Sequence, residues 1–445
     1  MSVTATSGVT ATSGVTATCG VGVTPGSRVA VVSCDPGIPV FGSKGASVHL
    51  QAVLGELVRR GAEVHLLTPR PGGPAPAALA GVTVHELPAV TGRPAPEREA
   101  SARCSDAAVA AVLDRLARQA PLDLLLERYS LWGRTGTAWA AARGVPSVLE
   151  VNAPLVREQA AHRVLHDRAG AEAVARHALA HAGAVVCVSE AVAVWARGVT
   201  DPARVHVVAN GTDTDRITPA VRAGGVRPLT VGFVGTLKPW HGTEHLVDAV
   251  ALLLDREPGW RLVVVGDGPE RDALAERAER LGITDAVELV GALPPEQVAA
   301  RLHGVDVGCA PYADLADFYF SPLKVYEYLA AGLPVVASRV PGMAGLLREG
   351  DLGALCRPAD PGDLADALAA LAADPQRRAR VGAAARAAAE REHTWSAVLD
   401  RVLAVAAVGD RPADRAADRP ADRPAHRAAS APAATAAPVR VGVVA

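Results

Sequence analysis

Short apolar runs alternate along the chain with longer stretches in which apolar residues recur at helical spacing, and this alternation predicts strands and helices in turn. Residues 28–33 form the first apolar run, and a loop rich in Gly and Pro follows it. The stretch 46–60 is amphipathic, and Gly61 is placed to end it as a helix. Further buried strands are predicted at 64–67, 122–126, 147–151 and 184–188.

The same pattern starts again in the second half of the chain. A strand at 229–234 precedes a helix at 245–254, and a strand at 261–265 runs into a Gly-Asp-Gly turn. The remaining elements predicted here are strands at 287–290, 305–309 and 333–337 and a closing helix at 398–408. Such alternation favours parallel sheets covered by helices on both faces. The predicted fold class is α/β, with two Rossmann-like, doubly wound domains that face each other across a cleft.

Low-complexity segments enclose this pattern. A hexapeptide repeats three times at the start, and its small polar residues cannot build a core. The last segment is rich in Asp, Arg, Pro and Ala, which is typical of a solvated tail. The predicted organisation is a leader at 1–26, a first Rossmann-like domain at 27–214, a linker at 215–228, a second Rossmann-like domain at 229–395, the closing helix at 396–408 and a tail at 409–445.

Composition excludes several classes of protein. Hydrophobic residues make up 49% of the chain and charged residues 21%, which is typical of a globular protein, and the formal net charge of −2 gives no reason to expect a nucleic-acid partner. The six cysteines show no CxxC spacing and are expected to be reduced thiols in the cytoplasm, with no zinc site. We find neither a spanning segment nor a signal peptide, and we expect a cytoplasmic protein, with peripheral contact to the inner face of the membrane left open.

Lysine is rare, since only Lys44, Lys238 and Lys324 occur among 45 basic residues, and all three lie in loops near strand ends. Ligands of α/β proteins bind at such loops, and a compact ammonium group suits a phosphate. The first lysine follows Gly42 and precedes Gly45, where a helix is predicted to begin. Glycines allow a close approach to an anion, although the loop matches neither a Walker A motif nor GxGxxG. Three surface lysines placed by chance remain the alternative.

The loop 235–242 follows the first strand of the second domain and contains Lys238 and His241. Either side chain could reach a diphosphate across the cleft. An ordinary turn with a solvated lysine explains the loop equally well in isolation.

A third motif spans residues 320–334. Ser321 is a reasonable N-cap and Pro322 occupies the favoured first helical position, so the amides of Leu323 and Lys324 are expected to be free for phosphate oxygens. Glu327 lies one turn further, where it could accept hydrogen bonds from a ribose diol. Without this context Glu327 would be a solvated helix carboxylate.

These motifs occur in the order found in one family. The chain resembles a retaining, nucleotide-sugar-dependent glycosyltransferase of the family 4 type with the GT-B fold, over roughly residues 28–405. The similar segments are 127–130, 149–154, 208–213, 234–242, 263–269 and 321–332.

The resemblance implies that the second domain binds the sugar nucleotide, with Glu327 on the ribose and Lys324 with the Ser321 and Leu323 backbone on the diphosphate. Leu293 would lie near the base. From the first domain, Gly42, Lys44 and Gly45 would lie near the phosphates.

The sequence departs from the family pattern at three places. Tyr319 occupies the position of a second acidic residue that usually binds the donor sugar. The usual Arg and Lys of the second loop correspond to Thr236 and His241, so Lys238 and Lys324 are expected to supply the positive charge. Asn152 replaces a histidine, and an amide cannot act as a general base at neutral pH.

Two residues are weaker candidates on the acceptor side. His49 lies on the helix after the first loop, and Arg128 could contact substrate or pair with Glu127.

The predicted function is transfer of a hexose, with retention and without a metal or other cofactor, from a UDP- or GDP-type sugar to a hydroxyl of a saccharide or lipid-linked acceptor. Cations and oriented amides would stabilise the leaving diphosphate. A GT-B phosphorylase that uses pyridoxal phosphate on one of the lysines and a non-catalytic sugar-nucleotide sensor are the alternatives. The oligomeric state is left open.

Overall fold

The computed structural model describes residues 22–220, 229–315, 318–319 and 321–408. Most of the predicted leader, part of the predicted linker and the whole tail at 409–445 lie outside these residues.

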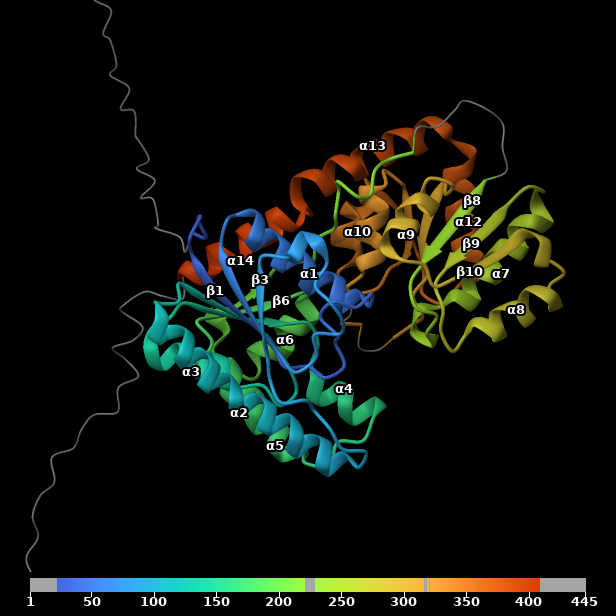
Figure 1. The fold of residues 1–445 in the computed structure, drawn as a ribbon. Helices are drawn as coiled ribbons and strands as arrows, with labels where there is room; N and C mark the ends of the chain where they lie inside the picture. Colours follow the sequence, from blue (N-terminus) through green and yellow to red (C-terminus); the bar gives the residue numbers. More distant parts are fainter. Residues whose placement is uncertain (1–21, 221–228, 316–317, 320, 409–445) are drawn as a thin grey trace, which may run out of the picture. The chain divides into compact units, whose positions relative to one another are not determined.

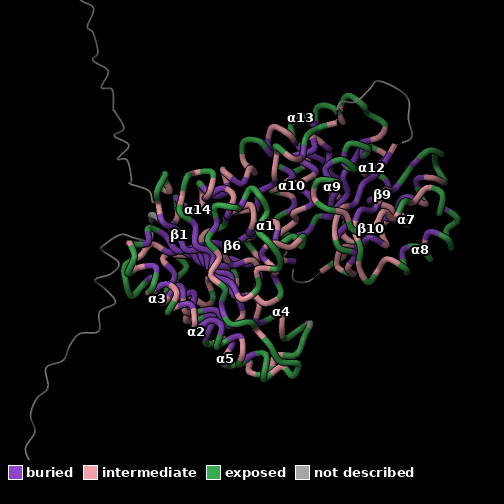
Figure 2. Tube along the Cα trace, viewed as in Figure 1, coloured by how far each residue is buried: buried purple, intermediate pink, exposed green. Residues whose placement is uncertain are grey.

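A parallel sheet of seven strands organises the first half of the chain (Figure 1), in the order β3-β2-β1-β4-β5-β6-β7. Its strands are apolar because helices cover both faces, and Figure 2 shows the sheet as buried. The strands are β1 Arg28–Ser33, β2 Glu63–Thr68, β3 Val82–Glu86, β4 Leu124–Arg128, β5 Ser147–Val151, β6 Ala184–Cys187 and β7 Val205–Val207. The α-helices are α1 Gly45–Arg59, α2 Ala95–Gln119, α3 Thr135–Arg143, α4 Leu155–His162, α5 Arg168–His181 and α6 Glu190–Arg197, with 3₁₀ turns η1 Ala77–Leu79 and η2 Pro202–Arg204.

A second parallel sheet of six strands follows, in the order β10-β9-β8-β11-β12-β13. The strands are β8 Thr230–Val234, β9 Arg261–Val265, β10 Val287–Gly291, β11 Val307–Ala310, β12 Val335–Ser338 and β13 Gly353–Cys356. The helices are α7 Thr243–Arg256, α8 Arg271–Arg280, α9 Pro295–Leu302, α10 Leu323–Ala330, α11 Met343–Leu346, α12 Pro361–Ala373, α13 Pro375–Glu392 and α14 Trp395–Val408, with 3₁₀ turns η3 Pro239–His241, η4 Thr284–Ala286 and η5 Arg348–Gly350. Both sheets have a Rossmann-like order, so the predicted α/β class is confirmed.

The chain crosses between the two sheets twice. The first crossing follows β7, and the second lies between α13 and α14, where the Thr212 amide donates to the His393 carbonyl over 2.7 Å. Helix α14 then packs on the first sheet, with Val398, Leu399 and Leu403 buried in the same core as Val29. The closing helix therefore belongs to the core of the N-terminal lobe.

Strand order also fixes where a ligand can bind. Successive strands are added in one direction up to the β1–β4 boundary of the first sheet and in the opposite direction beyond it, and the β8–β11 boundary of the second sheet is the same. Parallel sheets bind ligands beyond the carboxyl ends of their strands at such points. The loops after β1 and β8 contain two of the three lysines.

Two further properties concern the described residues as a whole. No described helix combines the length and apolar character that a membrane-spanning segment needs. The five cysteines of the described part are free thiols.

Candidate functional site

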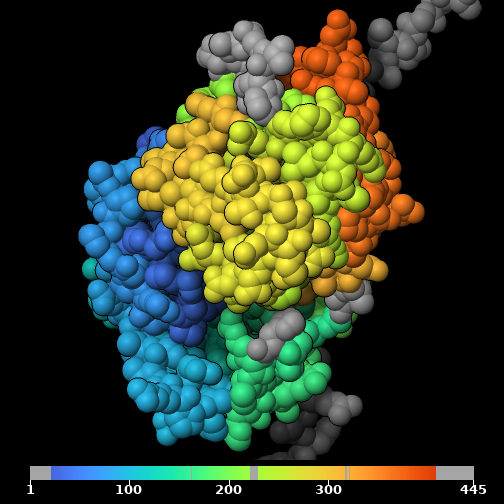
Figure 3. All heavy atoms as spheres, turned by 90° about the vertical axis from the view of Figure 1, so that its right-hand side faces the viewer, coloured from blue at the N-terminus to red at the C-terminus, as the bar shows by residue number. Residues whose placement is uncertain are grey.

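A cavity of about 420 Å³ lies among the loops that follow β1, β8 and β9, the start of α10 and the first crossing segment. Figure 3 shows the surfaces of the two lobes meeting where blue atoms of the first adjoin yellow atoms of the second. The cavity brings together these predicted site residues: Lys44, Gly45, His49, His241, Leu293, Ser321, Leu323, Lys324 and Glu327. It does not include Gly42, Arg128, Asn152, Lys238 or Tyr319.

Lys324 is the buried cation of this cavity. Helix α10 presents it with only 7% of its surface exposed, and its Nζ lies 4.4 Å from the ring centre of Phe233 and 4.9 Å from that of Tyr312. Burial lowers the pKa of Lys324 to about 7, although the nearby Cys309 and Glu327 act in the opposite direction. The two aromatic faces stabilise the charged form, so protonated Lys324 can bind an anion in the cavity.

The main chain approaches Lys324 closely at Gly235, the residue after β8. A Cβ atom at Gly235 would lie 3.1 Å from Lys324 Cε, and its φ of +145° is one that other residues rarely adopt. The φ angle favours glycine here, and any larger residue would also shift Lys324.

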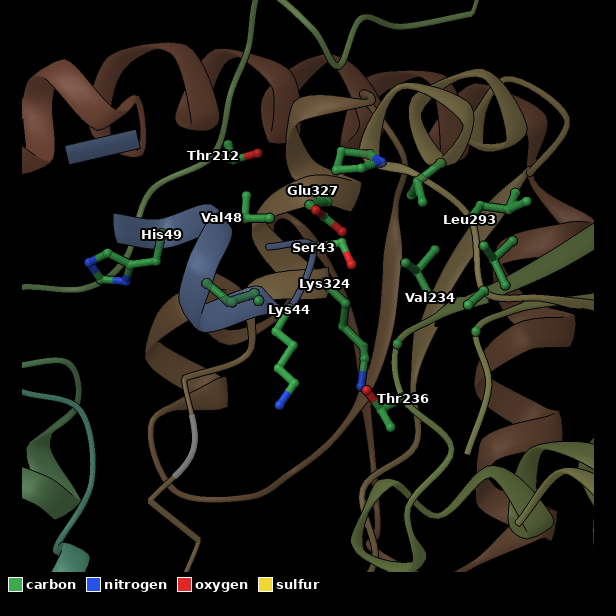
Figure 4. A pocket seen from close by; sticks show the side chains of 18 of the residues that line it. Ser43, Lys44, Val48, His49, Thr212, Val234, Thr236, Leu293, Lys324 and Glu327 are labelled. Carbon is green, nitrogen blue, oxygen red and sulfur yellow. The ribbon is translucent and has the colours of Figure 1, made fainter. Parts of the chain in front are cut away.

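Glu327 lies one turn further along α10 and lines the same cavity (Figure 4). Burial raises the pKa of this carboxyl group, and the positive charges of Arg216 and Lys324 oppose that rise. A partly desolvated carboxylate between cations is suited to accept hydrogen bonds from a diol.

The start of α10 differs from the prediction. The N-cap is Pro322 with no side-chain cap, and the Ser321 hydroxyl instead accepts a hydrogen bond of 2.7 Å from Asn210 Nδ2. The Leu323 amide donates to the Ser321 carbonyl over 3.0 Å, so it is not free as predicted. The reason is that Pro322 adopts a non-helical conformation and closes a tight turn before the helix begins.

Of the two second-loop side chains that could reach a diphosphate, His241 lines the cavity and Lys238 does not. His241 lines the cavity, but burial and the neighbouring Lys324 lower its pKa to about 3, and its Nδ1 is bonded to the Thr236 carbonyl. His241 is therefore a neutral imidazole at pH 7. Lys238 lies outside the cavity lining, with its Nζ 5.8 Å from the ring centre of Trp240.

Lys44 reaches the cavity from the opposite lobe. It is the N-cap of α1, and its Nζ donates to the Gly37 carbonyl over 3.1 Å. Figure 4 shows Lys44 and Lys324 extending into the cavity from different helices. Gly45 lies against α10, since a Cβ atom there would be 3.2 Å from Leu323 Cδ1, whereas Gly42 packs on Pro39 and does not line the cavity.

His49 and Leu293 lie at opposite ends of the view in Figure 4. His49 is buried, its ring is 4.8 Å from that of Trp395, and its Nε2 is 2.6 Å from Glu150 Oε1. Burial alone would raise the pKa of Glu150, but His49 and Arg128 beside it lower the pKa to about 2.

That arrangement decides the role of Arg128. Its Nη1 lies 3.4 Å from Glu150 Oε2, so pairing with Glu127 is wrong. Glu127 Oε2 instead accepts from the Thr137 amide over 2.8 Å, and burial raises the pKa of Glu127 to about 8. Asn152 follows β5 near Glu150, outside the cavity lining.

Tyr319 also lies away from the cavity. Its hydroxyl donates to Glu158 Oε2 on α4 over 3.2 Å, and its carbonyl accepts from Ser189 Oγ over 3.0 Å. A donor-sugar contact at this position is therefore not what the structure shows.

The cavity also contains residues outside the motifs. They come from the first turn of α1 and from the two crossings: Val48, Arg216 and Trp395. Segments that meet only because the chain crosses back carry no local sequence signal. Within the described ranges, no three His, Cys, Asp or Glu side chains group so as to bind a metal ion.

Two opposed Rossmann-like lobes with lysines and a helix start around one cavity are suited to bind a phosphate-bearing ligand. Family models identify the class as glycosyltransferases. Residues 43–216 match the model described as Glycosyltransferase Family 4, and residues 228–374 match Glycosyl transferases group 1.

One relative extends the match to most of the chain. The D-inositol 3-phosphate glycosyltransferase of Stackebrandtia nassauensis is 32% identical over 423 residues, 86% of this chain and 91% of that protein. The protein of the same name from Corynebacterium glutamicum is 34% identical over 198 residues, which span 41% of this chain and 46% of the relative. The chain thus matches less than half the length of that relative and of others like it.

Solved structures show the same fold. Sucrose-phosphate synthase from Thermosynechococcus elongatus superimposes with a TM-score of 0.65 at 20% identity, covering 84% of this chain and 97% of the other. Anabaena HepE in complex with UDP-glucose gives a TM-score of 0.61 at 18% identity, covering 84% and 98%. The chain belongs to glycosyltransferase family 4 and has the GT-B fold.

Proposed function

We propose that this protein transfers a hexose, with retention and without a metal ion, from a UDP- or GDP-sugar to a hydroxyl of a saccharide or lipid-linked acceptor. Family membership supports transfer from a nucleotide sugar, and the HepE complex supports UDP-glucose as the first donor to test. The relatives named for D-inositol 3-phosphate support an acceptor that is a ring bearing several hydroxyls.

The observation that carries the proposal is the buried Lys324 opposite Lys44 in one cavity. Breaking the bond between the sugar and the diphosphate leaves negative charge on the departing phosphate. Two ammonium groups, at least one of them partly desolvated, stabilise that charge more strongly than they would in water. Arrival of the anion favours the protonated form of Lys324.

The other residues position the donor. Glu327 accepts hydrogen bonds from the ribose hydroxyls, and Leu293 lies near the base. His49 occupies the opposite end of the cavity, where Glu150 holds its ring in place. Family membership supports retention, and we propose that the departing phosphate takes the acceptor proton.

A first experiment tests the donor. UDP and GDP are added separately to the protein and the melting temperature is measured, because a ligand of the native state raises it by mass action. The nucleotide that binds then defines the nucleotide sugar for transfer assays, in which NMR of the product reports the anomeric configuration. We expect the transfer rate with EDTA to stay within about twofold of the rate without it, since lysines and not a metal ion neutralise the phosphate charge in this proposal. If neither nucleotide raises the melting temperature, the proposal is wrong.

A further inference from the structure

A second cavity, of about 500 Å³, lies within the N-terminal lobe. It is formed by the loop after β1, the start of α2, the loop after β4 and helix α4. None of the predicted site residues lines it. Its volume is in the range of small-molecule sites.

The first loop joins this second cavity to the donor cavity. Residues 34–38 line the second cavity, and Ser43, Lys44 and Gly45 line the donor cavity. The two are also linked directly, because Lys44 Nζ donates to the carbonyl of Gly37. A molecule in the second cavity would therefore lie next to the phosphate end of the donor site.

The lining of the second cavity combines three kinds of group. Arg98, Arg163 and Gln159 provide donors, and Asp35 and Glu158 provide acceptors. Its apolar walls come from Ile38, Ala102, Leu131, Trp132, Leu155 and Val164.

Such a mixture matches a saccharide better than an anion. Each sugar hydroxyl both donates and accepts, and the ring also has apolar C–H faces. A phosphate would face the carboxylates of Asp35, Glu99 and Glu158. The neighbouring cation Arg70 already donates to the carbonyl of Pro36.

Hydrogen bonds connect the second cavity with the donor helix. Glu158 lines the cavity and accepts from the Tyr319 hydroxyl, while Ser189 Oγ donates to the Tyr319 carbonyl. Two residues later, Ser321 lines the donor cavity and accepts from Asn210. Tyr319 therefore connects the Glu158 carboxylate of the second cavity with the segment that precedes α10.

We infer that the second cavity binds a neutral saccharide acceptor, free or as the headgroup of a lipid, and that Tyr319 is a positioning residue that orients Glu158 toward it. The inference rests on the proposed function for the identity of the acceptor. It replaces a donor-sugar role for Tyr319 with an acceptor-side role.

The test measures binding directly, so it does not require turnover. Calorimetry on the full chain uses UDP, GDP, methyl α-glucoside, methyl α-mannoside, glucose 6-phosphate and inositol 3-phosphate as separate probes. We expect at least one methyl glycoside to bind. Tyr319→Phe should weaken that binding about three- to tenfold, because Glu158 must then be ordered on binding. The affinity for the nucleotide should stay within about twofold.

Tyr129→Phe is the matched control. Tyr129 is buried in the same lobe, and its hydroxyl has no hydrogen-bond partner among the described residues. It should leave both affinities unchanged. Glu158→Ala should reproduce the Tyr319→Phe effect on the glycoside, and it provides a second variant if the first alters folding.

The outcomes separate the two proposals. Glycoside binding without nucleotide binding would refute the proposed function and keep the saccharide site. Three outcomes would overturn the inference while the protein still binds a nucleotide. Neither methyl glycoside binds, or a sugar phosphate binds more than tenfold tighter than the methyl glycosides. In the third, Tyr319→Phe weakens binding of the nucleotide alone. Octyl glucoside, used below its micelle concentration, distinguishes a free saccharide from a lipid headgroup. Tighter binding of octyl glucoside than of methyl glucoside indicates a lipid-linked acceptor, and equal binding of the two indicates a free saccharide.

Discussion

Replacement of Lys324 by methionine should make the protein more stable and less able to bind a nucleotide. Methionine has similar length, is apolar and adapts to irregular space, so it can fill the position between Phe233 and Tyr312. A lysine that served only the fold would give the opposite result for stability.

The magnitude follows from the pKa. The group has an ordinary value of 10.5 and a value of about 7 in the folded chain, which corresponds to roughly 4 kcal/mol of lost stability at pH 7. Contact with the two aromatic rings stabilises the charged form by about 1 to 2 kcal/mol and offsets part of this loss. The expected increase in the free energy of unfolding for Lys324→Met is therefore roughly 2 to 3 kcal/mol. The unfolded chain holds the extra proton between these pKa values, so wild-type stability rises with pH from 7 toward 10.5. The advantage of the methionine variant should shrink over the same interval.

Urea unfolding at pH 7 and pH 9 measures the stability difference, and calorimetry with UDP or GDP measures affinity. We expect a gain in midpoint at pH 7 that is smaller at pH 9, together with a roughly ten- to hundredfold loss of affinity for the nucleotide that the wild type binds. Lys238→Met is the control, because Lys238 is half-buried outside the cavity and should change neither quantity strongly. A variant that is less stable than the wild type, or that binds the nucleotide equally well, would refute the reasoning.

Three further predictions concern neighbouring residues. Glu327→Ala should weaken binding of the nucleoside diphosphate roughly tenfold and leave pyrophosphate within about twofold, since only the former has a ribose; calorimetry with both probes checks this, and equal losses would contradict the ribose role. Gly235→Ala should lower the free energy of unfolding by about 1 to 3 kcal/mol and weaken nucleotide binding, because the new Cβ meets Lys324 Cε. The control is Gly282→Ala, which is also at positive φ but in open space, and it should lower stability without changing nucleotide binding. Arg386→Ala should cost roughly 2 to 4 kcal/mol in urea unfolding, because Arg386 donates to the carbonyls of Thr214, Ile217 and Ala330 at 2.7 to 3.0 Å; the exposed Arg380→Ala on the same helix should be neutral, and a similar loss there would argue against the carbonyl contacts.

Central strands were predictable from the sequence because both faces of each are buried. Arg28–Ser33, Ser147–Val151 and Arg261–Val265 have the predicted bounds. The strand expected at 122–126 lies at Leu124–Arg128, because Arg128 continues the strand and is stabilised by Glu150. The edge strands Val82–Glu86 and Val205–Val207 were missed, since their partly exposed faces interrupt the apolar run.

The site was predictable where the residues of one local motif also lie together in the cavity. The stretch from Ser321 to Glu327 is such a case, and Ser321, Lys324 and Glu327 share one cavity. The pairing of Arg128 with Glu150 and the contact of Tyr319 with Glu158 were not predictable, because each joins residues far apart in sequence. Folding supplies these partners, and no local spacing encodes them.

The departures at the second loop and the low pKa of Lys324 have a common physical basis. His241 is neutral because it is buried and lies beside Lys324, and a second full charge there would raise the cost of burying the lysine further. The ligand-free cavity therefore carries less positive charge than its residue types suggest. A diphosphate would compensate by drawing a proton onto Lys324, so nucleotide affinity should fall as pH rises above 7. Sensitivity of this kind belongs to a buried lysine and not to an arginine, whose charge does not change in this range, which gives a chain that otherwise uses arginine a physical reason to keep lysine at this position.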